Sequence, residues 1–593
     1  MVSGLTGTGL VLQDNGGNNL TVTANGAFTF TTAVASGGAY AVTVLTQPST
    51  PAQNCVVTGG SGNASANVTS VQVTCTTVTP TLTIGGTVTN LVGSGLVLQD
   101  NGGDNLTVTA NGNFTFITLV ASGGPYAVTV LTQPSAPAQI CGVANGSGTA
   151  NANVINVTVN CGHNEWAWMG GSNVANASGT YGSLGVAAST NVPGVRNFGP
   201  VSWTDASGNL WLFGGSGLDS AGTNGDLNDL WKYNITLGQW TWVSGSNLVS
   251  QSGTYGILNT PATGNVPGAR DSAVGWIDPL GNLWLFGGEG LDSAGTFGNL
   301  NDLWEYTVST NKWTWKGGSN IVNQSGVYGA LNVPAAGNIP GARGFSTVQI
   351  ISGQVWLFGG FGSDSAGTQS NLNDLWEYTL SSGEWTWMGG SNVVNAAGVY
   401  GTKGTAAAAN IPGARYSAAT WTDTSGNFWL FGGGNQVSAS TVNYFNDLWE
   451  FSTVSKEWTW MNGSNAINQS GTYGTQGTAA AGNTPGGRSD TMSWTDPSGN
   501  FWLFGGIGFD STTNQVNLND LWEFSVSTNE WTWKNGPNVG NGNGTFGTLG
   551  QLAPTNIPSS REGGARWADA SGNLWLFSGS GTFAFNDLWM YFP

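Results

Sequence analysis

The sequence is poor in charge, and in basic residues above all. Of its 593 residues 7% are charged, with 13 Lys and Arg against 31 Asp and Glu, which gives a net charge of −18. Clustered Lys and Arg hold phosphates and anionic lipid headgroups, so neither nucleic acid nor an anionic membrane surface is an expected partner. No apolar run approaches the roughly 18 residues that a membrane helix needs, so no membrane span is expected.

Histidine and cysteine are equally scarce. The one histidine, His163, argues against a His-rich zinc site and against a catalytic triad, and we expect it to be a solvated linker residue. The four cysteines form two equally spaced pairs, which predicts the disulfides Cys55–Cys75 and Cys141–Cys161. Disulfides indicate an oxidising compartment, so we expect a secreted or cell-surface protein. No cofactor is expected.

One module occurs twice in the N-terminal part. The stretch "GLVLQDNGGNNLTVTANGAFTF" from Gly9 returns as "GLVLQDNGGDNLTVTANGNFTF" from Gly95. Alternating segments separated by Asn-Gly and Gly-Gly turns predict two small β-sandwiches, at residues 1–79 and 80–162. In layout and composition they resemble the Ig-like repeats of bacterial surface proteins. The first copy lacks the strand that opens the second, "PTLTIGGTVTN", and the chain opens "MVSGLTGTGL" without the features of a signal peptide, so we expect it to be the downstream part of a longer secreted protein.

A second repeat system occupies residues 163–593. A phrase such as "KWTW" begins at residues 165, 239, 312, 384, 457 and 530, and each unit adds a long loop, "PGAR" or a variant, a "WTDxSGNLWLFGG" hairpin and "NDLWEY". A fixed period with several short strands per unit predicts a six-bladed β-propeller. All 29 Trp lie at repeat positions, so none is left for a private site. Because the system starts with a fourth strand and ends with a third, we expect the Trp166 strand to pair with the C-terminal strands.

These residues resemble the kelch family: paired glycines after an apolar strand ("LWLFGG"), then an aromatic strand ("NDLWEY"), then a Trp ("NKWTW"). The order recurs in all six units, with "LWLFSG" in the last. The resemblance implies an all-β kelch propeller with two sandwich modules before it. Kelch propellers include the galactose oxidase type, whose copper is held by two His and two Tyr, one of them cross-linked to Cys. With a single His and no Cys in its propeller, this chain does not have that site.

Two sets of repeated residues are candidates for ligand binding. Six arginines precede the innermost strands and would ring one mouth of the channel and hold an acidic ligand, or else fix their own loops through carbonyls and carboxylates. An aromatic recurs in each loop after "WTW" and would stack on a sugar or contact a protein, or else pin down its own loop. The candidates are Arg196, Arg270, Arg343, Arg415, Arg488 and Arg561, and Tyr181, Tyr255, Tyr328, Tyr400, Tyr473 and Phe546.

Two sets of aspartates also recur. Those of "NDLW" (Asp229, Asp302, Asp374, Asp447, Asp520 and Asp587) are typical of residues that start a turn. Those of the loops after "FGG" would supply oxygen ligands for calcium, although their spacing matches no EF-hand and ordinary polar loops explain them as well. These weak calcium candidates are Asp219, Asp292, Asp364 and Asp510.

The sequence favours a secreted or surface protein whose propeller is a non-catalytic binding or adhesion module for an extracellular glycan or protein. One alternative is a metal-independent carbohydrate-active enzyme, a lyase or epimerase of acidic sugars that uses the arginine ring. Another is a structural surface-layer component. A paired-carboxylate glycosidase site also remains open, because the distance between carboxylates cannot be read from sequence.

Overall fold

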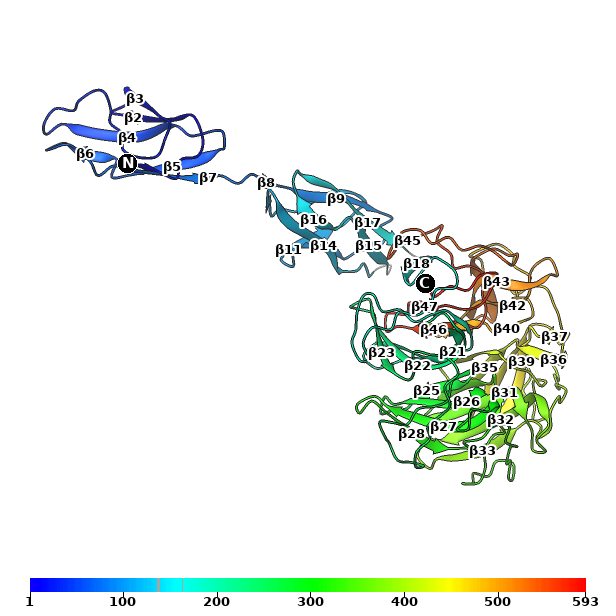
Figure 1. Ribbon diagram of the computed structural model, residues 1–593. Helices are drawn as coiled ribbons and strands as arrows, with labels where there is room; N and C mark the ends of the chain where they lie inside the picture. Colours follow the sequence, from blue (N-terminus) through cyan, green and yellow to red (C-terminus); the bar gives the residue numbers. More distant parts are fainter. Residues whose placement is uncertain (136–138, 163) are drawn as a thin grey trace. The chain divides into compact units, whose positions relative to one another are not determined.

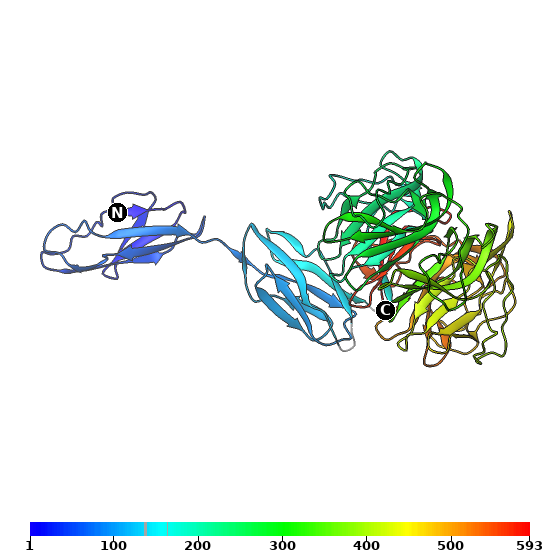
Figure 2. The same ribbon diagram turned by 90° about the horizontal axis from the view of Figure 1, so that it is seen from below.

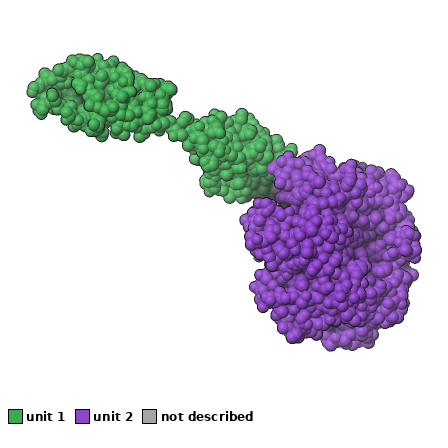
Figure 3. All heavy atoms as spheres, viewed as in Figure 1, with its two compact units in different colours: residues 1–161 green, residues 162–593 purple. Residues whose placement is uncertain are grey.

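A computed structural model describes residues 1–135, 139–162 and 164–593. The predicted linker role of His163 falls outside these residues. The described residues contain strands and no helix, so none of them forms a helix that crosses a membrane. The chain divides into two compact units, Met1–Cys161 and Gly162–Pro593 (Figure 3).

Each N-terminal module is a pair of β-sheets around one apolar core. The first module has sheets of order β1-β7-β5 and β3-β2-β4-β6, and the second has β12-β9-β17-β15 and β11-β10-β14-β16, with a short β13-β8 pair. Leu12 and Leu98 occupy equivalent positions in β2 and β10 and are fully buried. The Ig-like nature of these sandwiches stays a prediction. The strands of the first module are β1 (Val2–Ser3), β2 (Leu10–Asp14), β3 (Asn18–Val22), β4 (Ala39–Thr46), β5 (Gln53–Thr58), β6 (Ser61–Asn63) and β7 (Gln72–Thr77).

The strands of the second module are β8 (Thr81–Leu82), β9 (Ile84–Thr89), β10 (Leu96–Asp100), β11 (Asp104–Val108), β12 (Gly112–Thr115), β13 (Val120–Ala121), β14 (Gly124–Thr132), β15 (Ile140–Ala144), β16 (Ser147–Ala150) and β17 (Val154–Gly162).

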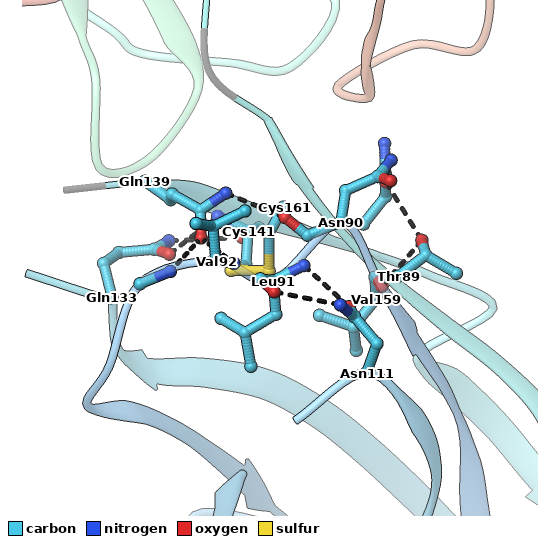
Figure 4. Close-up of a disulfide and its surroundings, with 12 residues drawn as sticks. Thr89, Asn90, Leu91, Val92, Asn111, Gln133, Gln139, Cys141, Val159 and Cys161 are labelled. Carbon is cyan, nitrogen blue, oxygen red and sulfur yellow. Dashed lines mark hydrogen bonds between the residues drawn. A yellow bond between two sulfur atoms is a disulfide. The ribbon is translucent and has the colours of Figure 1, made fainter. Parts of the chain in front are cut away.

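Both expected disulfides are present, Cys55–Cys75 between β5 and β7 and Cys141–Cys161 between β15 and β17. Around the second one, Gln139 Oε1 accepts the N–H of Val92 at 2.7 Å while Gln139 Nε2 donates to the carbonyl of Asn90 at 2.8 Å (Figure 4). The amide therefore fixes the loop beside the disulfide.

Residues 164–593 form a ring of six blades, each an antiparallel sheet. We number the blades by their innermost strands, which are β20, β25, β30, β34, β41 and β46, and each of these strands contacts the next around a closed circle. The prediction of an all-β chain with a six-bladed propeller is confirmed. Figures 1 and 2 show the blades coloured from green through yellow to red in the order of the sequence. The red C-terminal strand β48 pairs with β18, the first strand of the propeller.

The strands of blades 1 to 3 are β19 (Arg196–Phe198), β20 (Val201–Thr204), β21 (Leu210–Leu218), β22 (Asn224–Asn234) and β23 (Gln239–Ser244); β24 (Arg270–Asp271), β25 (Val274–Ile277), β26 (Leu283–Leu291), β27 (Phe297–Thr307) and β28 (Lys312–Gly317); and β29 (Arg343–Gly344), β30 (Thr347–Ile351), β31 (Gln354–Ser363), β32 (Gln369–Thr379) and β33 (Glu384–Gly389).

The strands of blades 4 to 6 are β34 (Ala419–Thr422), β35 (Phe428–Phe431), β36 (Gly434–Ser438), β37 (Thr441–Tyr444), β38 (Leu448–Ser452) and β39 (Glu457–Asn462); β40 (Arg488–Ser489), β41 (Met492–Thr495), β42 (Phe501–Phe509), β43 (Gln515–Ser525) and β44 (Glu530–Asn535); and β46 (Ala565–Ala568), β47 (Leu574–Phe577), β48 (Leu588–Phe592), β18 (Glu165–Gly170) and β45 (Leu552–Ala553).

The ring closes within blade 6, where the first strand of the propeller pairs with the last. Trp166 of β18 lies opposite Tyr591 of β48, and Trp168 lies opposite Trp589. Trp166 is fully buried and also packs against Phe504 of blade 5, with ring centroids 5.2 Å apart. Equivalent Trp–Phe contacts join the other pairs of neighbouring blades. Each Trp buries on the order of 150–250 Å², so these contacts hold the blades together.

Candidate functional site

One buried ion pair lies inside each blade. In blade 3, Arg343 donates from Nη1 to Asp374 Oδ1 and from Nη2 to Asp374 Oδ2, both at 2.7 Å, and from Nε to the carbonyl of Gly341 at 2.9 Å. Tyr328 Oη and Trp376 Nε1 donate to the same carboxylate at 2.6 and 2.8 Å. The six pairs are Arg196–Asp229, Arg270–Asp302, Arg343–Asp374, Arg415–Asp447, Arg488–Asp520 and Arg561–Asp587.

The six arginines therefore do not ring the channel mouth, and that expectation is corrected. The six arginines are at most 1% exposed. Their guanidinium N–H groups, as in Arg343, donate to protein carbonyls and carboxylates, so they have no free face for an acidic ligand. Burial opposes ionisation of Arg343, but the Asp374 carboxylate outweighs it and raises the pKa of the guanidinium. The alternative reading, in which each arginine fixes its own loop, agrees with this geometry.

The loop aromatics belong to the same networks. Burial, and after it the charge of Asp374, raises the pKa of Tyr328, and the equivalent residues Tyr181, Tyr255, Tyr400 and Tyr473 bind their own aspartates in the same way. Phe546 has no hydroxyl and packs against Trp589 at 5.1 Å. These rings hold down their own loops, so they are not available for stacking on a sugar.

The calcium candidates are turn caps. Asp292 Oδ1 accepts the N–H groups of Ala294 and Thr296 at 2.8 and 2.9 Å, and its Oδ2 accepts that of Val322 at 3.3 Å. Asp219, Asp364 and Asp510 make equivalent bonds, and all four residues are at most 2% exposed. Within the described ranges, no group of three or more His, Cys, Asp or Glu is arranged to hold a metal ion. The calcium reading is therefore not supported.

A ring of backbone hydrogen bonds encircles the channel at the arginine end of the innermost strands. One residue per blade has a φ between 49° and 66°, and its N–H donates to the carbonyl of the equivalent residue in the preceding blade, at 2.8 to 3.2 Å. Four of the six are not glycine, although only glycine adopts this conformation without steric cost. We call this set the amide ring; it consists of Gly199, Ser272, Phe345, Ser417, Asp490 and Gly563.

The amide ring borders two hollows. A channel of about 400 Å³ runs between the innermost strands, and a second pocket of about 420 Å³, which we call the mouth pocket, shares Phe198, Phe345 and Asp490 with it. The Phe198 and Phe345 rings lie 5.7 Å apart although they come from blades 1 and 3, and Phe345 lies 5.9 Å from Tyr416 of blade 4. Aromatic side chains thus reach across the channel axis at the mouth.

Carboxylates and aromatic rings make up most of the mouth pocket. Glu289 of blade 2, Asp490 of blade 5 and Glu562 of blade 6 line it together with Phe361, Tyr444, Gln436, Ile507 and the three rings already named. Among the described residues that line it, none is Lys, Arg or His. The pocket can therefore accept hydrogen bonds and stack on flat or cationic groups, but it has no positive charge for an anion.

The carboxyl groups at the mouth are held close to one another. Burial, and after it the charge of Asp490, raises the pKa of Glu562 to about 8. Burial and the charge of Asp226 likewise raise the pKa of Asp271 to about 8, and Asp271 lies opposite Glu289 in the register of β24 and β26. Burial also raises the pKa values of Asp226, Glu289 and Asp490. Three of these carboxyl groups line the mouth pocket, and Asp226 and Asp271 act electrostatically on Glu289 and on each other from outside it.

Sequence reasoning missed this site, although a signal was available. The residue after each invariant arginine differs between blades, and at blades 2, 4 and 6 it is Asp271, Tyr416 and Glu562. These positions carry the mouth pocket or the carboxylates behind it. A position whose residue differs between blades, while its neighbours repeat, is not required for the folding of the blade.

Comparison with known families agrees with this architecture. Residues 248–467 match the model of the KLHDC2/KLHL20/DRC7 Kelch-repeats domain. The match covers blades 2 to 4 in full, from β24 to β39, and the same strand pattern recurs in the other three blades. The chain therefore carries a kelch-repeat β-propeller. No curated protein matches the chain.

Proposed function

We propose that this protein is a non-catalytic binding protein of the cell exterior, which holds a protein partner at the mouth pocket of its kelch propeller. The observation that carries the proposal is the contrast between the blade interiors, which repeat, and the mouth pocket, which does not. The Arg–Asp–Trp network recurs in all six blades, with two Arg–Asp hydrogen bonds in five of them and one in blade 1, whereas the mouth pocket is lined by different residue types from the six blades. Residues that the repeat does not require are the ones available for recognition.

Kelch repeats favour a protein as the partner, and the two disulfides favour an oxidising, extracellular location. The enzyme of acidic sugars loses its support, because it relied on arginines that are now buried in ion pairs. A carboxylate-rich pocket also repels the carboxylate of such a sugar.

The test is selection of a displayed random-peptide library on the full chain, with a glycan array as a parallel arm. We expect peptides that bind the wild-type chain and lose binding to Phe361→Ser or Tyr416→Ser, both of which remove an aromatic from the mouth pocket. The matched control is Leu280→Ser, which changes a residue 87% exposed in the turn at the far end of β25 and should bind as wild type does. Peptides that do not distinguish these variants contradict the proposal. Glycans that do distinguish them assign the mouth to a sugar instead, and no ligand in either arm favours a structural role.

A further inference from the structure

We propose that the mouth pocket takes a basic side chain, Lys or Arg, from the segment of the partner that it binds. This inference rests on the proposed function and names the chemistry of the group recognised.

Charge is the first argument. Glu289, Asp490 and Glu562 line one pocket of about 420 Å³ from three different blades, and Asp271 lies opposite Glu289 in the register of β24 and β26. Carboxylates that share a partly buried site repel one another, and each is denied part of its hydration. An entering cation removes the repulsion and supplies a positive charge, which none of the described residues that line the pocket carries. The hydrogen bond that Asp490 Oδ2 accepts from Ser489 Oγ leaves the negative charge of the pocket uncompensated.

The aromatic side chains are the second argument. Phe198, Phe345 and Tyr416 form a continuous row across the mouth, with neighbouring ring centroids 5.7 and 5.9 Å apart. The faces of such rings attract an ammonium or guanidinium group, and the attraction is larger where water is displaced. The same rings cover the aliphatic stem of Lys or Arg, so both halves of the side chain find a matching surface.

Unsatisfied hydroxyls in the adjoining channel are the third argument, independent of the carboxylates. Thr347 Oγ1 and Thr491 Oγ1 have no hydrogen-bond partner among the described residues, and the two residues are 8% and 9% exposed. Both line the channel next to the amide ring, Thr491 directly after Asp490 and Thr347 two residues after Phe345. A hydroxyl oxygen accepts hydrogen bonds, and an ammonium group carries three donors and no acceptor. These two hydroxyls line the channel that borders the mouth pocket at Phe345 and Asp490, so a donor group that reaches past the pocket carboxylates meets further acceptors there.

An acidic segment of the partner is disfavoured at long range as well as at the mouth pocket. The chain carries a net charge of −18, so its field attracts a basic segment and repels an acidic one before contact. The six arginines do not change this at the mouth, because each pairs with its own buried aspartate. A further arginine, Arg566, lines the channel but is not among the residues that line the mouth pocket.

The test measures binding of four blocked pentapeptides, Gly-Ser-X-Ser-Gly with Lys, Arg, Gln or Glu at X, to the full chain by isothermal titration calorimetry. We expect the Lys and Arg peptides to bind roughly tenfold tighter than the Gln peptide, and the Glu peptide weakest. The double variant Glu289→Gln, Glu562→Gln should lose that preference. Its matched control is Glu384→Gln, Glu457→Gln, which removes the same two charges from the outer strands β33 and β39 and should keep the preference.

Equal binding of the four peptides, binding of none of them, or equal losses in the two double variants would overturn the inference. Unchanged near-ultraviolet circular dichroism establishes that each variant is folded. The library selection separates failure of this inference from failure of the proposed function. Peptides without Lys or Arg that bind the wild-type chain but not the mouth-pocket variants would contradict this inference and leave the proposed function in place. If no ligand depends on the mouth pocket, both the inference and the proposed function are wrong.

Discussion

Nη2 of Arg343 lies 2.7 Å from Oδ2 of Asp374, and neither side chain is exposed to solvent. Removing one member of such a pair leaves the other charge buried without a counterion. We expect Arg343→Gln to lower the free energy of unfolding by about 3–5 kcal/mol, measured by urea denaturation. The control is Lys316→Gln, which breaks a partly exposed pair with Glu305 and should cost less than about 1 kcal/mol. Equal losses would refute a structural role for the buried pairs.

Tyr328 tests the hydroxyl that joins the loop to this pair. Its Oη donates to Asp374 at 2.6 Å, and a buried hydrogen bond to a charged group contributes about 1.5–3 kcal/mol. Tyr328→Phe should destabilise by that amount in the same assay. Phe546 occupies the equivalent position in blade 6, so Phe546→Tyr should instead raise stability, and a loss there would show that the sixth blade is built differently.

Ring closure predicts a global effect from a change at the chain end. Deleting the last ten residues removes β48 (Leu588–Phe592), which pairs with both β18 and β47. We expect the propeller to lose its cooperative unfolding transition and its near-ultraviolet circular dichroism as a whole. Removal of residues 1–79 is the control and should leave the propeller transition in place. A truncated chain that loses only a fraction of the signal would contradict closure.

The carboxyl groups at the mouth predict an unusual pH dependence of stability. Burial raises the folded pKa values of Asp271 and Glu562 to about 8, from the ordinary values of 3.8 for Asp and 4.5 for Glu. Between pH 4.5 and 8 the folded state therefore holds more protons than the unfolded state, and the free energy of unfolding falls as pH rises through this interval. The groups that face these two carboxyls are Asp226, Glu289 and Ser272 for Asp271, and Asp490, Tyr416 and Tyr444 for Glu562.

Thermal unfolding of the wild type at pH 5 to 9, compared with Asp271→Asn, Glu562→Gln, measures this effect. The double variant should lose most of the decline above pH 6. A bound basic side chain favours the ionised carboxyls, so the affinity of the Lys peptide should rise over the same interval. A wild-type midpoint that increases toward pH 8 would oppose the assignment.

Reduction of the disulfides should act on the N-terminal modules alone. Each disulfide closes a loop of 20 residues, and its loss costs a module roughly 3 kcal/mol in the chain-entropy account. All four cysteines of the sequence are in these bonds, so the propeller transition should stay at its temperature in dithiothreitol. A shift of that transition would contradict the independence of the two units.

The repeat made the propeller predictable, because period, turn residues and strand alternation all describe one blade. Arg343 shows where this reasoning failed. Its place before an innermost strand was correctly read, but the direction of its side chain depends on Asp374, a partner 31 residues away. The aspartates of "NDLW" were read as turn starters for the same reason, whereas their carboxylates bind arginine. Local sequence specifies strands well and the partners of long polar side chains poorly.

The mouth pocket was unpredictable for a different reason. Its side chains come from separate blades, and their proximity depends on closure of the whole ring rather than on any one repeat. Phe198 and Phe345 are far apart in sequence, and their rings lie 5.7 Å apart only because ring closure brings the side chains of blades 1 and 3 together at the mouth. The sequence prediction relied on the repeated positions, whereas the mouth pocket is formed by positions that differ between blades.

The amide ring holds the mouth together through backbone bonds, whereas the side chains of its members determine the chemistry of the mouth. Its six bonds join backbone N–H and C=O groups only, and its members already include Gly, Ser, Phe and Asp. At the four positions that are not glycine, exchanging the side chain therefore leaves these backbone bonds in place while changing what projects from the ring, whereas a side chain at Gly199 would clash with the backbone of Ser272. A lineage, or a protein engineer, can rewrite the specificity of the mouth blade by blade without redesigning the propeller that carries it.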